Sequence, residues 1–79
     1  MNVVLLGNYL GSKQGKTKNG DYYHIVSILS GDSAVRVSFD DDSISVFEDI
    51  TDKDRLQEVS VQCDLNIYNG NAYFHALPY

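Results

Sequence analysis

The stretch YYHIVSILSGDSAVRVSF, from Tyr22 to Phe39, decides the fold class of this chain. Apolar and polar residues alternate on both sides of Gly31-Asp32, and such alternation is typical of strands that bury one face. Gly31-Asp32 is a turn signal, so we expect a hairpin of two antiparallel strands. A two-residue turn predicts the pairs Ser30–Ser33, Ile28–Val35, Val26–Val37 and His24–Phe39. One face of the hairpin is then apolar, and the opposite face is mixed, with Tyr23, Ile25, Ser27, Leu29, Ala34, Arg36 and Ser38.

Two more segments favour strands. Val3–Leu10 is an apolar run, in which Gly7 indicates a bulge or a bend. In the alternating segment from Glu58 to Asn69, we expect the inward residues to be Val59, Val61, Cys63, Leu65 and Ile67. Asn69-Gly70 is the strongest hairpin signal in the chain, because a type I′ turn needs positive φ at both central residues. It predicts the pairs Tyr68–Asn71, Ile67–Ala72, Asn66–Tyr73, Leu65–Phe74 and Asp64–His75.

The segment from Asp40 to Glu58 breaks the alternation. Its apolar residues predict a short helical stripe over one end of the core, formed by Ile44, Phe47 and Ile50, with Leu56 as a further candidate. Five strands with a helical or irregular segment between the third and the fourth predict an all-β, five-stranded Greek-key OB-fold barrel. An SH3-like small barrel, which connects similar strands differently, is the alternative.

Length and composition allow a single domain, residues 1–79. The one cysteine, Cys63, excludes an internal disulfide and fits a reducing compartment. The chain has no apolar run of membrane-spanning length, and its N-terminus lacks the layout of a signal peptide. We therefore expect a soluble cytoplasmic protein with no membrane partner.

The charge of the chain is strongly polarised. Its net charge of −5 argues, taken alone, against binding nucleic acid, whose phosphates need cations. Residues 1–39, however, hold four Lys and Arg against two Asp, a net charge of +2. Residues 40–79 hold two Lys and Arg against nine carboxylates, a net charge of −7. The charge of the whole chain therefore describes neither half.

Cations and aromatic rings gather in and directly after GSKQGKTKNGD, Gly11–Asp21, which we expect to be a loop. Single-stranded nucleic acid is held by cations along its phosphates and by aromatic faces that stack on bases, at about 1–3 kcal/mol per base. In OB-folds, the second and third strands and the loop after the first strand form this surface. We predict a site that contains Lys13, Lys16, Lys18, Tyr22, Tyr23, Ile25 and Arg36. Tyr23 is the better stacking candidate because it belongs to the mixed face.

Each of these residues alone fits a solvated loop or a tyrosine chosen as a good strand former, but their combination favours binding. Tyr68 and Tyr73, on the outer face of the last hairpin, extend the predicted stacking platform. Cross-strand packing and a subunit contact are equally good interpretations of these two tyrosines.

The remaining polar clusters favour structural roles. Asp64 opposite His75 could orient a base or a metal ligand, but nothing completes such a site, so we expect a surface hydrogen bond. His24 is expected to be half-buried, and Cys63 to pack in the core. The acidic run from Asp40 to Asp54 lacks the ligand spacing of an EF-hand, and a solvated face is favoured over a cation site. We expect no enzymatic activity, no cofactor and no metal.

The N-terminal third resembles the bacterial single-stranded DNA-binding proteins. The matching residues are Met1-Asn2, the run VVLLG from Val3 to Gly7, Leu10, and Thr17–Gly20. The chain is also similar to the helix-destabilising proteins of filamentous phages, through Lys18, Gly20, Tyr23 and Ile25. These resemblances imply an OB-fold that coats single-stranded DNA as a homodimer or higher homo-oligomer. The chain stops at Ala76–Tyr79 without an acidic tail, so we expect no recruitment of partners through a tail.

Two functional hypotheses follow. The first is a non-enzymatic, helix-destabilising protein of a phage or mobile element, which coats single-stranded DNA during replication with little sequence preference. RNA stays open as a ligand, because discrimination at the 2′-OH depends on the detail of a pocket. The alternative is a protein-interaction module or a DNA-mimicking inhibitor that acts through the acidic segment 40–58.

Overall fold

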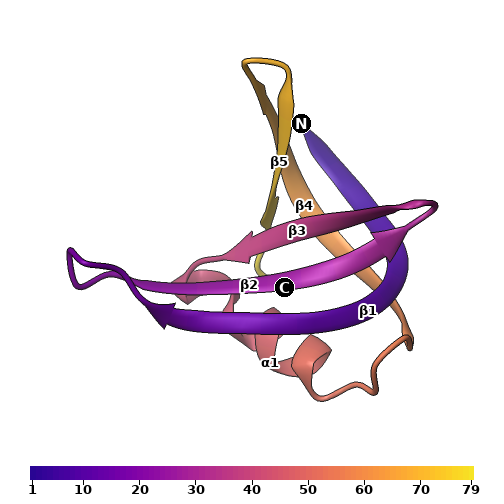
Figure 1. Ribbon diagram of the computed structural model, residues 1–79, viewed down its shortest axis with the longest axis horizontal. Coiled ribbons are helices and arrows are strands. Elements are labelled where there is room, and N and C mark those ends of the chain that lie inside the picture. Colours follow the sequence, from indigo (N-terminus) through magenta and orange to yellow (C-terminus); the bar gives the residue numbers. More distant parts are fainter.

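The alternating segments of the sequence form five strands that close into a barrel (Figure 1). The structure is a computed structural model that describes residues 1–79. Its strands are β1 (Asn2–Lys16), β2 (Tyr22–Ser30), β3 (Ser33–Phe39), β4 (Glu58–Tyr68) and β5 (Asn71–Ala76). A 3₁₀ turn, η1 (Asp41–Ser43), and the helix α1 (Ile44–Thr51) connect β3 to β4. The closed order β1-β2-β3-β5-β4 confirms the predicted barrel of the OB-fold type.

Both predicted hairpins form with the predicted register. The turn between β2 and β3 gives all four expected pairs, and Val26, Ile28 and Val37 are completely buried. The β4–β5 hairpin gives all five expected pairs. Asn69 and Gly70 have φ values of 51° and 77°, as the type I′ turn requires. Local turn chemistry and alternation therefore agree with the barrel at both places.

The prediction that Ile67 points into the core is wrong. Its side chain is 69% exposed, although Val59, Val61 and Cys63 on the same face of β4 are buried. The cause is visible in Figure 1, where the β4–β5 hairpin projects past the body of the barrel. Alternation sets the face on which Ile67 lies, but no other element covers that face at the end of the hairpin.

The prediction of a loop over Gly11–Asp21 is also wrong for most of its length. β1 continues to Lys16, because β2 supplies partners for it from Gly11 opposite Ser27 to Lys16 opposite Tyr22. The connection between the strands is only the short turn that follows, residues 17–21. In Figure 1 the β1–β2 hairpin is therefore a long arm that extends sideways from the barrel.

The predicted irregularity of β1 is a bulge in one place and a bend in another. The register against β2 shifts between Tyr9 and Gly11, so the bulge lies at Leu10 and not at Gly7. β1 also curves round the barrel (Figure 1), and it changes partner from β4 to β2 beside Gly7, at Asn8, which pairs with both strands. A Cβ atom on Gly7 would lie 2.3 Å from the carbonyl oxygen of Leu29, so only glycine allows this close approach.

The predicted helical stripe closes one end of the core. Phe47 and Ile50 of α1 are buried, as is Val46. The ring of Phe47 makes edge contacts with Phe39 and with the half-buried His24, at centroid distances of 5.4 and 4.9 Å. Leu56 does not belong to the stripe, since it follows the helix, has a φ of 71° and is 56% exposed. No helix in the chain has the length and apolar character needed to cross a membrane.

Candidate nucleic-acid interface

The outward face of β1, β2 and β3 is the surface on which the mixed residues of the sequence meet. The bulge at Leu10 fixes which residues of β1 contribute to it, because one extra residue reverses the alternation. Beyond the bulge, Lys13 lies beside Ile25, and Ile25 lies beside Ser38 of β3. Two residues further along β2, on the same face, Ser27 lies between Gly11 of β1 and Arg36 of β3. We call Lys13, Tyr23, Ile25 and Arg36 the outward set.

Tyr23 lies across Gly15, its partner on β1. A Cβ atom on Gly15 would be 2.6 Å from the Tyr23 hydroxyl oxygen and 2.8 Å from the ring carbon that carries it. The ring therefore occupies the space that any other residue at position 15 would fill. Tyr23 is half-buried as a result, with one side of the ring held against the hairpin. Such a fixed ring can stack on a base at a low cost in side-chain entropy.

Lys13 and Arg36 flank a shallow hollow. The hollow has a volume of about 450 Å³, and its lining residues are Leu10, Gly11, Ser12, Lys13, Ser27, Ala34 and Arg36. The two ion pairs of the structure involve the N-terminal ammonium and His75, so Lys13 and Arg36 have no carboxylate partner. Two free cations around a floor of small residues form a surface that suits a phosphate group.

The structure separates the predicted cations into two groups. Lys16 lies one residue beyond Gly15, so it takes the opposite face of the hairpin from Lys13, together with Tyr22. Its ammonium nitrogen is 5.6 Å from the centroid of the Tyr22 ring, a cation–π contact. Lys18 belongs to the turn at the end of the arm. We call Lys16, Lys18 and Tyr22, which is 73% exposed, the arm set.

Tyr68 and Tyr73 lie on a different projection, the β4–β5 hairpin (Figure 1). They are 68% and 54% exposed. Tyr73 is two residues from His75, which pairs with Ser38 of β3, so Tyr73 is the nearer of the two to the outward set. Of the two tyrosines predicted to extend the stacking platform, Tyr73 therefore lies closer to the outward set, and Tyr68 lies at the far end of that hairpin.

Asp64 and His75 form hydrogen bonds with other residues and not with each other. The two residues are paired across β4 and β5, but the His75 ring bonds Ser38 Oγ through Nδ1, at 2.9 Å, and Asp40 through Nε2. Asp64 accepts a hydrogen bond of 2.9 Å from the Met1 ammonium, which lowers the pKa of the Asp64 carboxyl below its usual value. The imidazole thus joins β5 to Ser38 of β3 and to Asp40, the residue that precedes η1.

The acidic run surrounds the end of the barrel that η1 and α1 cover. Asp40 caps η1 through a reciprocal pair of hydrogen bonds with Ser43, and Asp41 and Asp42 occupy its first turn. No three His, Cys, Asp or Glu side chains converge as a metal site would require.

Comparison of the chain with protein-family models, with curated proteins and with solved structures found no match.

Proposed function

We propose that the protein binds and coats single-stranded DNA, without catalysis and with little sequence preference. The observation that carries the proposal is the outward set, in which cations, an aliphatic side chain and a braced tyrosine share one face of an OB-fold barrel. This is the combination that holds unpaired nucleic acid, because cations follow the phosphates and rings accept bases of any identity.

The arrangement suggests a path for the strand. A phosphate occupies the hollow between Lys13 and Arg36, and the base next to it passes Ile25 and stacks on Tyr23. The strand then passes round the end of the arm by way of Lys18 to the opposite face of the hairpin, where Lys16 supplies a further cation and Tyr22 a second exposed ring. Tyr73 and Tyr68 extend the surface on the other side.

A single copy offers few cations, so coating needs several copies. Four Lys and Arg lie in residues 1–39, and they are the ones in the two sets. A homodimer or higher homo-oligomer that binds one strand at several sites raises the affinity through effective concentration, without new contacts at each site. The resemblance to the bacterial single-stranded DNA-binding proteins and the phage helix-destabilising proteins supports this role. As part of the same proposal, we assign the protein to the replication of a phage or mobile element in the cytoplasm.

Fluorescence anisotropy with a labelled oligo-dT tests the proposal. We expect saturable binding that weakens as salt rises, because phosphate contacts release counterions, and weaker binding to a duplex of the same length. A parallel titration with oligo-U measures whether RNA competes. Absence of binding to oligo-dT at low salt, with folded protein, would contradict the proposal.

A further inference from the structure

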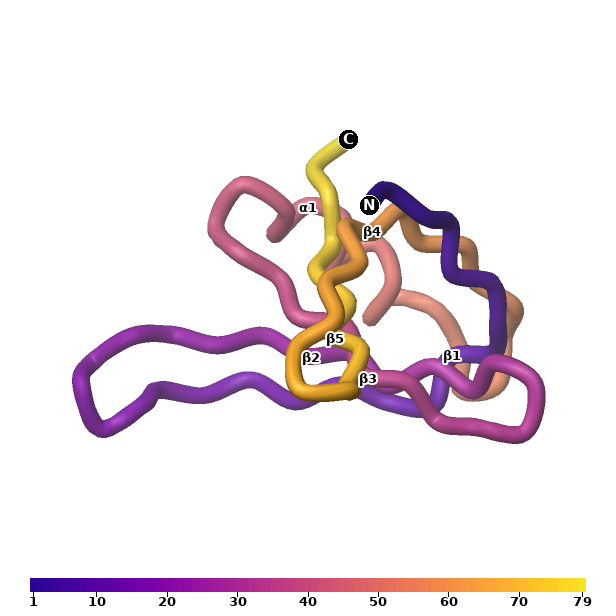
Figure 2. The backbone as a smooth tube through the Cα atoms, turned by 90° about the horizontal axis from the view of Figure 1, so that it is seen from above, coloured from indigo at the N-terminus to yellow at the C-terminus, as the bar shows by residue number.

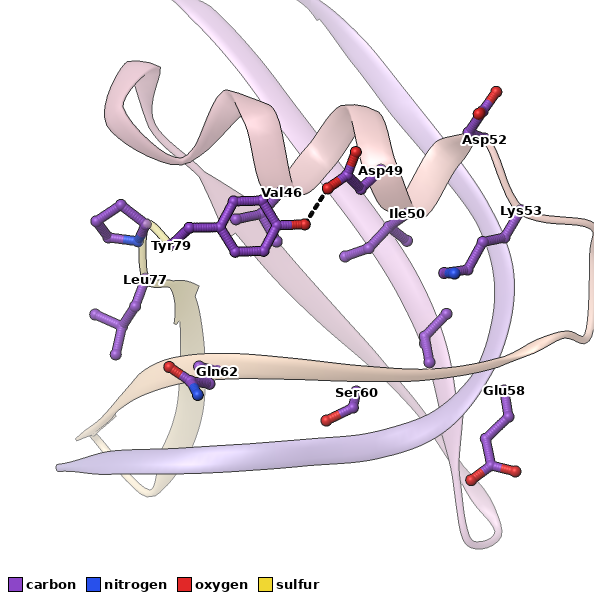
Figure 3. Close-up of a pocket in the computed structure, with 12 residues that line it drawn as sticks. Val46, Asp49, Ile50, Asp52, Lys53, Glu58, Ser60, Gln62, Leu77 and Tyr79 are labelled. Carbon is purple, nitrogen blue, oxygen red and sulfur yellow. Dashed lines mark hydrogen bonds between the residues drawn. The ribbon is translucent and has the colours of Figure 1, made fainter.

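A groove on the other side of the molecule runs between α1 and β4 (Figure 3). Its volume is about 690 Å³, within the range of sites that accommodate ligands. The apolar part of its lining comes from Val46 and Ile50 of α1, Val59 of β4, and Leu77. None of the outward set or the arm set contributes to the lining.

The end of the chain forms one wall of the groove. The backbone N–H of Leu77 donates a hydrogen bond of 2.9 Å to the Gln62 carbonyl oxygen, which anchors this segment to β4. Tyr79 donates its hydroxyl proton to the Asp49 carboxylate (Figure 3), and this bond raises the Tyr79 pKa above its usual value. Tyr79 is nevertheless 84% exposed, so the wall presents an accessible ring to the groove.

An exposed apolar strip continues the groove onto β1. Val4 of β1 pairs with Gln62 and Leu6 pairs with Ser60, so both apolar side chains lie on the same face of the sheet as these two β4 residues that line the groove. They are 56% and 59% exposed. These two aliphatic side chains enlarge the apolar surface beside the groove, and contiguous apolar surface of this kind favours binding to another protein.

The charge around the groove indicates the kind of partner. Asp49, Asp52 and Glu58 line it together with one cation, Lys53. In Figure 3, Lys53 points toward the groove, whereas Asp52 and Glu58 point outward at its rim. Residues 40–58 as a whole hold eight carboxylates against two cations. A negative rim repels nucleic acid and attracts a positively charged chain.

We propose that this groove binds a short, basic segment of a partner protein whose apolar side chains enter the groove and whose Lys or Arg side chains meet Asp52 and Glu58. Figure 2 shows α1 and the C-terminus on one side of the molecule and the arm formed by β1 and β2 on the other. One copy can therefore bind this segment and a nucleic-acid strand at the same time. The proposal does not depend on the proposed function.

A set of labelled nine-residue peptides tests this inference by fluorescence anisotropy. Each peptide carries two leucines and three lysines, with different spacings across the set, and each has two matched versions, leucine to serine and lysine to glutamate. We expect at least one Leu/Lys peptide to bind, and both of its matched versions to bind at least tenfold more weakly. Saturating oligo-dT leaves the affinity for the peptide unchanged.

Two substitutions locate the binding site. Ser60→Arg fills the groove from an exposed position of β4 and should abolish peptide binding, and Asp52→Lys should weaken it at least fivefold. Asp32→Lys makes the same change of charge in the β2–β3 turn and serves as the control, with no loss expected. Circular dichroism verifies that each variant is folded.

Several results would overturn the inference. One is that no Leu/Lys peptide binds, and another is that the Leu/Glu versions bind as tightly as the Leu/Lys peptides. A third is that the Ser60→Arg and Asp52→Lys proteins both bind the peptide as tightly as the wild type does. Sedimentation of the protein alone covers one more alternative. If the wild type self-associates and Ser60→Arg is monomeric, the groove holds a second copy of this chain, and the proposal of a foreign partner is wrong.

Discussion

Gly15 leaves the space in which the ring of Tyr23 lies. A methyl group there would clash with the far end of the tyrosine, so Gly15→Ala should turn the ring away from β1. Because only a side chain must move, we expect stability to fall by about 0.5–1.5 kcal/mol. The binding free energy for oligo-dT should also weaken, by part of the roughly 1–3 kcal/mol that one stacked base contributes. Urea denaturation and anisotropy measure the two effects, and unchanged DNA affinity would contradict the role of the braced ring.

Cys63 gives a pH-dependent prediction at the same scale. The thiol is completely buried, and burial raises its pKa from 9.0 to about 11. Between these two values the unfolded chain has lost the proton and the folded protein retains it, so stability falls as pH rises through this window. The loss should approach roughly 2–3 kcal/mol by pH 11.

A Cys63→Ala variant separates this effect from other alkaline titrations. Urea denaturation of wild type and variant at pH 8 and pH 10.5 gives the two differences in stability. We expect the wild type to lose more stability than the variant over this range. Equal losses would show that the thiol does not carry the effect.

At the scale of elements, β1 and β2 approach each other closely at Gly7. Gly7 approaches the backbone of Leu29 so closely that a methyl group would meet a carbonyl oxygen at 2.3 Å, and backbone cannot turn away as a side chain does. We expect Gly7→Ala to destabilise the barrel by about 1–3 kcal/mol or more, the usual effect of overpacking. Urea denaturation beside Gly15→Ala checks this, and a smaller effect at position 7 than at position 15 would contradict the account.

The two hairpins could be predicted from the sequence because their determinants are local. Gly31-Asp32 and Asn69-Gly70 set the turns, and alternation sets the register on either side. The continuation of β1 to Lys16 could not be predicted in this way. That segment is polar and rich in glycine, and it forms a strand because β2 lies beside it. The exposure of Ile67 likewise depends on where the rest of the barrel ends.

The composition of the candidate site could be predicted, but its geometry could not. Tyr23, Ile25 and Arg36 lie outward as expected, because the hairpin register determines their face. Lys13 and Lys16 lie on opposite faces, and the bulge at Leu10 decides which of the two joins the outward set. A bulge is a shift in the pairing of two strands, so the alternation of one strand alone does not show where it lies. The groove beside α1 had no sequence signal beyond its acidic residues, since residues far apart in the chain form it.

At the scale of the whole molecule, the property to test is the uneven distribution of charge between the two sides. Lys13 belongs to the outward set, and Lys53 lines the groove on the other side. Lys13→Glu and Lys53→Glu change the net charge equally, so a general electrostatic effect would weaken DNA binding equally in both. We expect Lys13→Glu to weaken binding much more and to lower the slope of log affinity against log salt by about 0.7, one phosphate contact. Titrations at several salt concentrations measure both quantities.

The most direct test of the central claim is the affinity of Tyr23→Ala for oligo-dT, measured by anisotropy at low and moderate salt. Tyr79→Ala is the matched control, because it removes an exposed tyrosine from the groove. We predict that Tyr23→Ala lowers the affinity by about 5- to 150-fold, equivalent to about 1–3 kcal/mol, and that Tyr79→Ala leaves it unchanged. If the folded Tyr23→Ala protein binds oligo-dT as tightly as the wild type does, the outward face of β1, β2 and β3 is not the nucleic-acid interface.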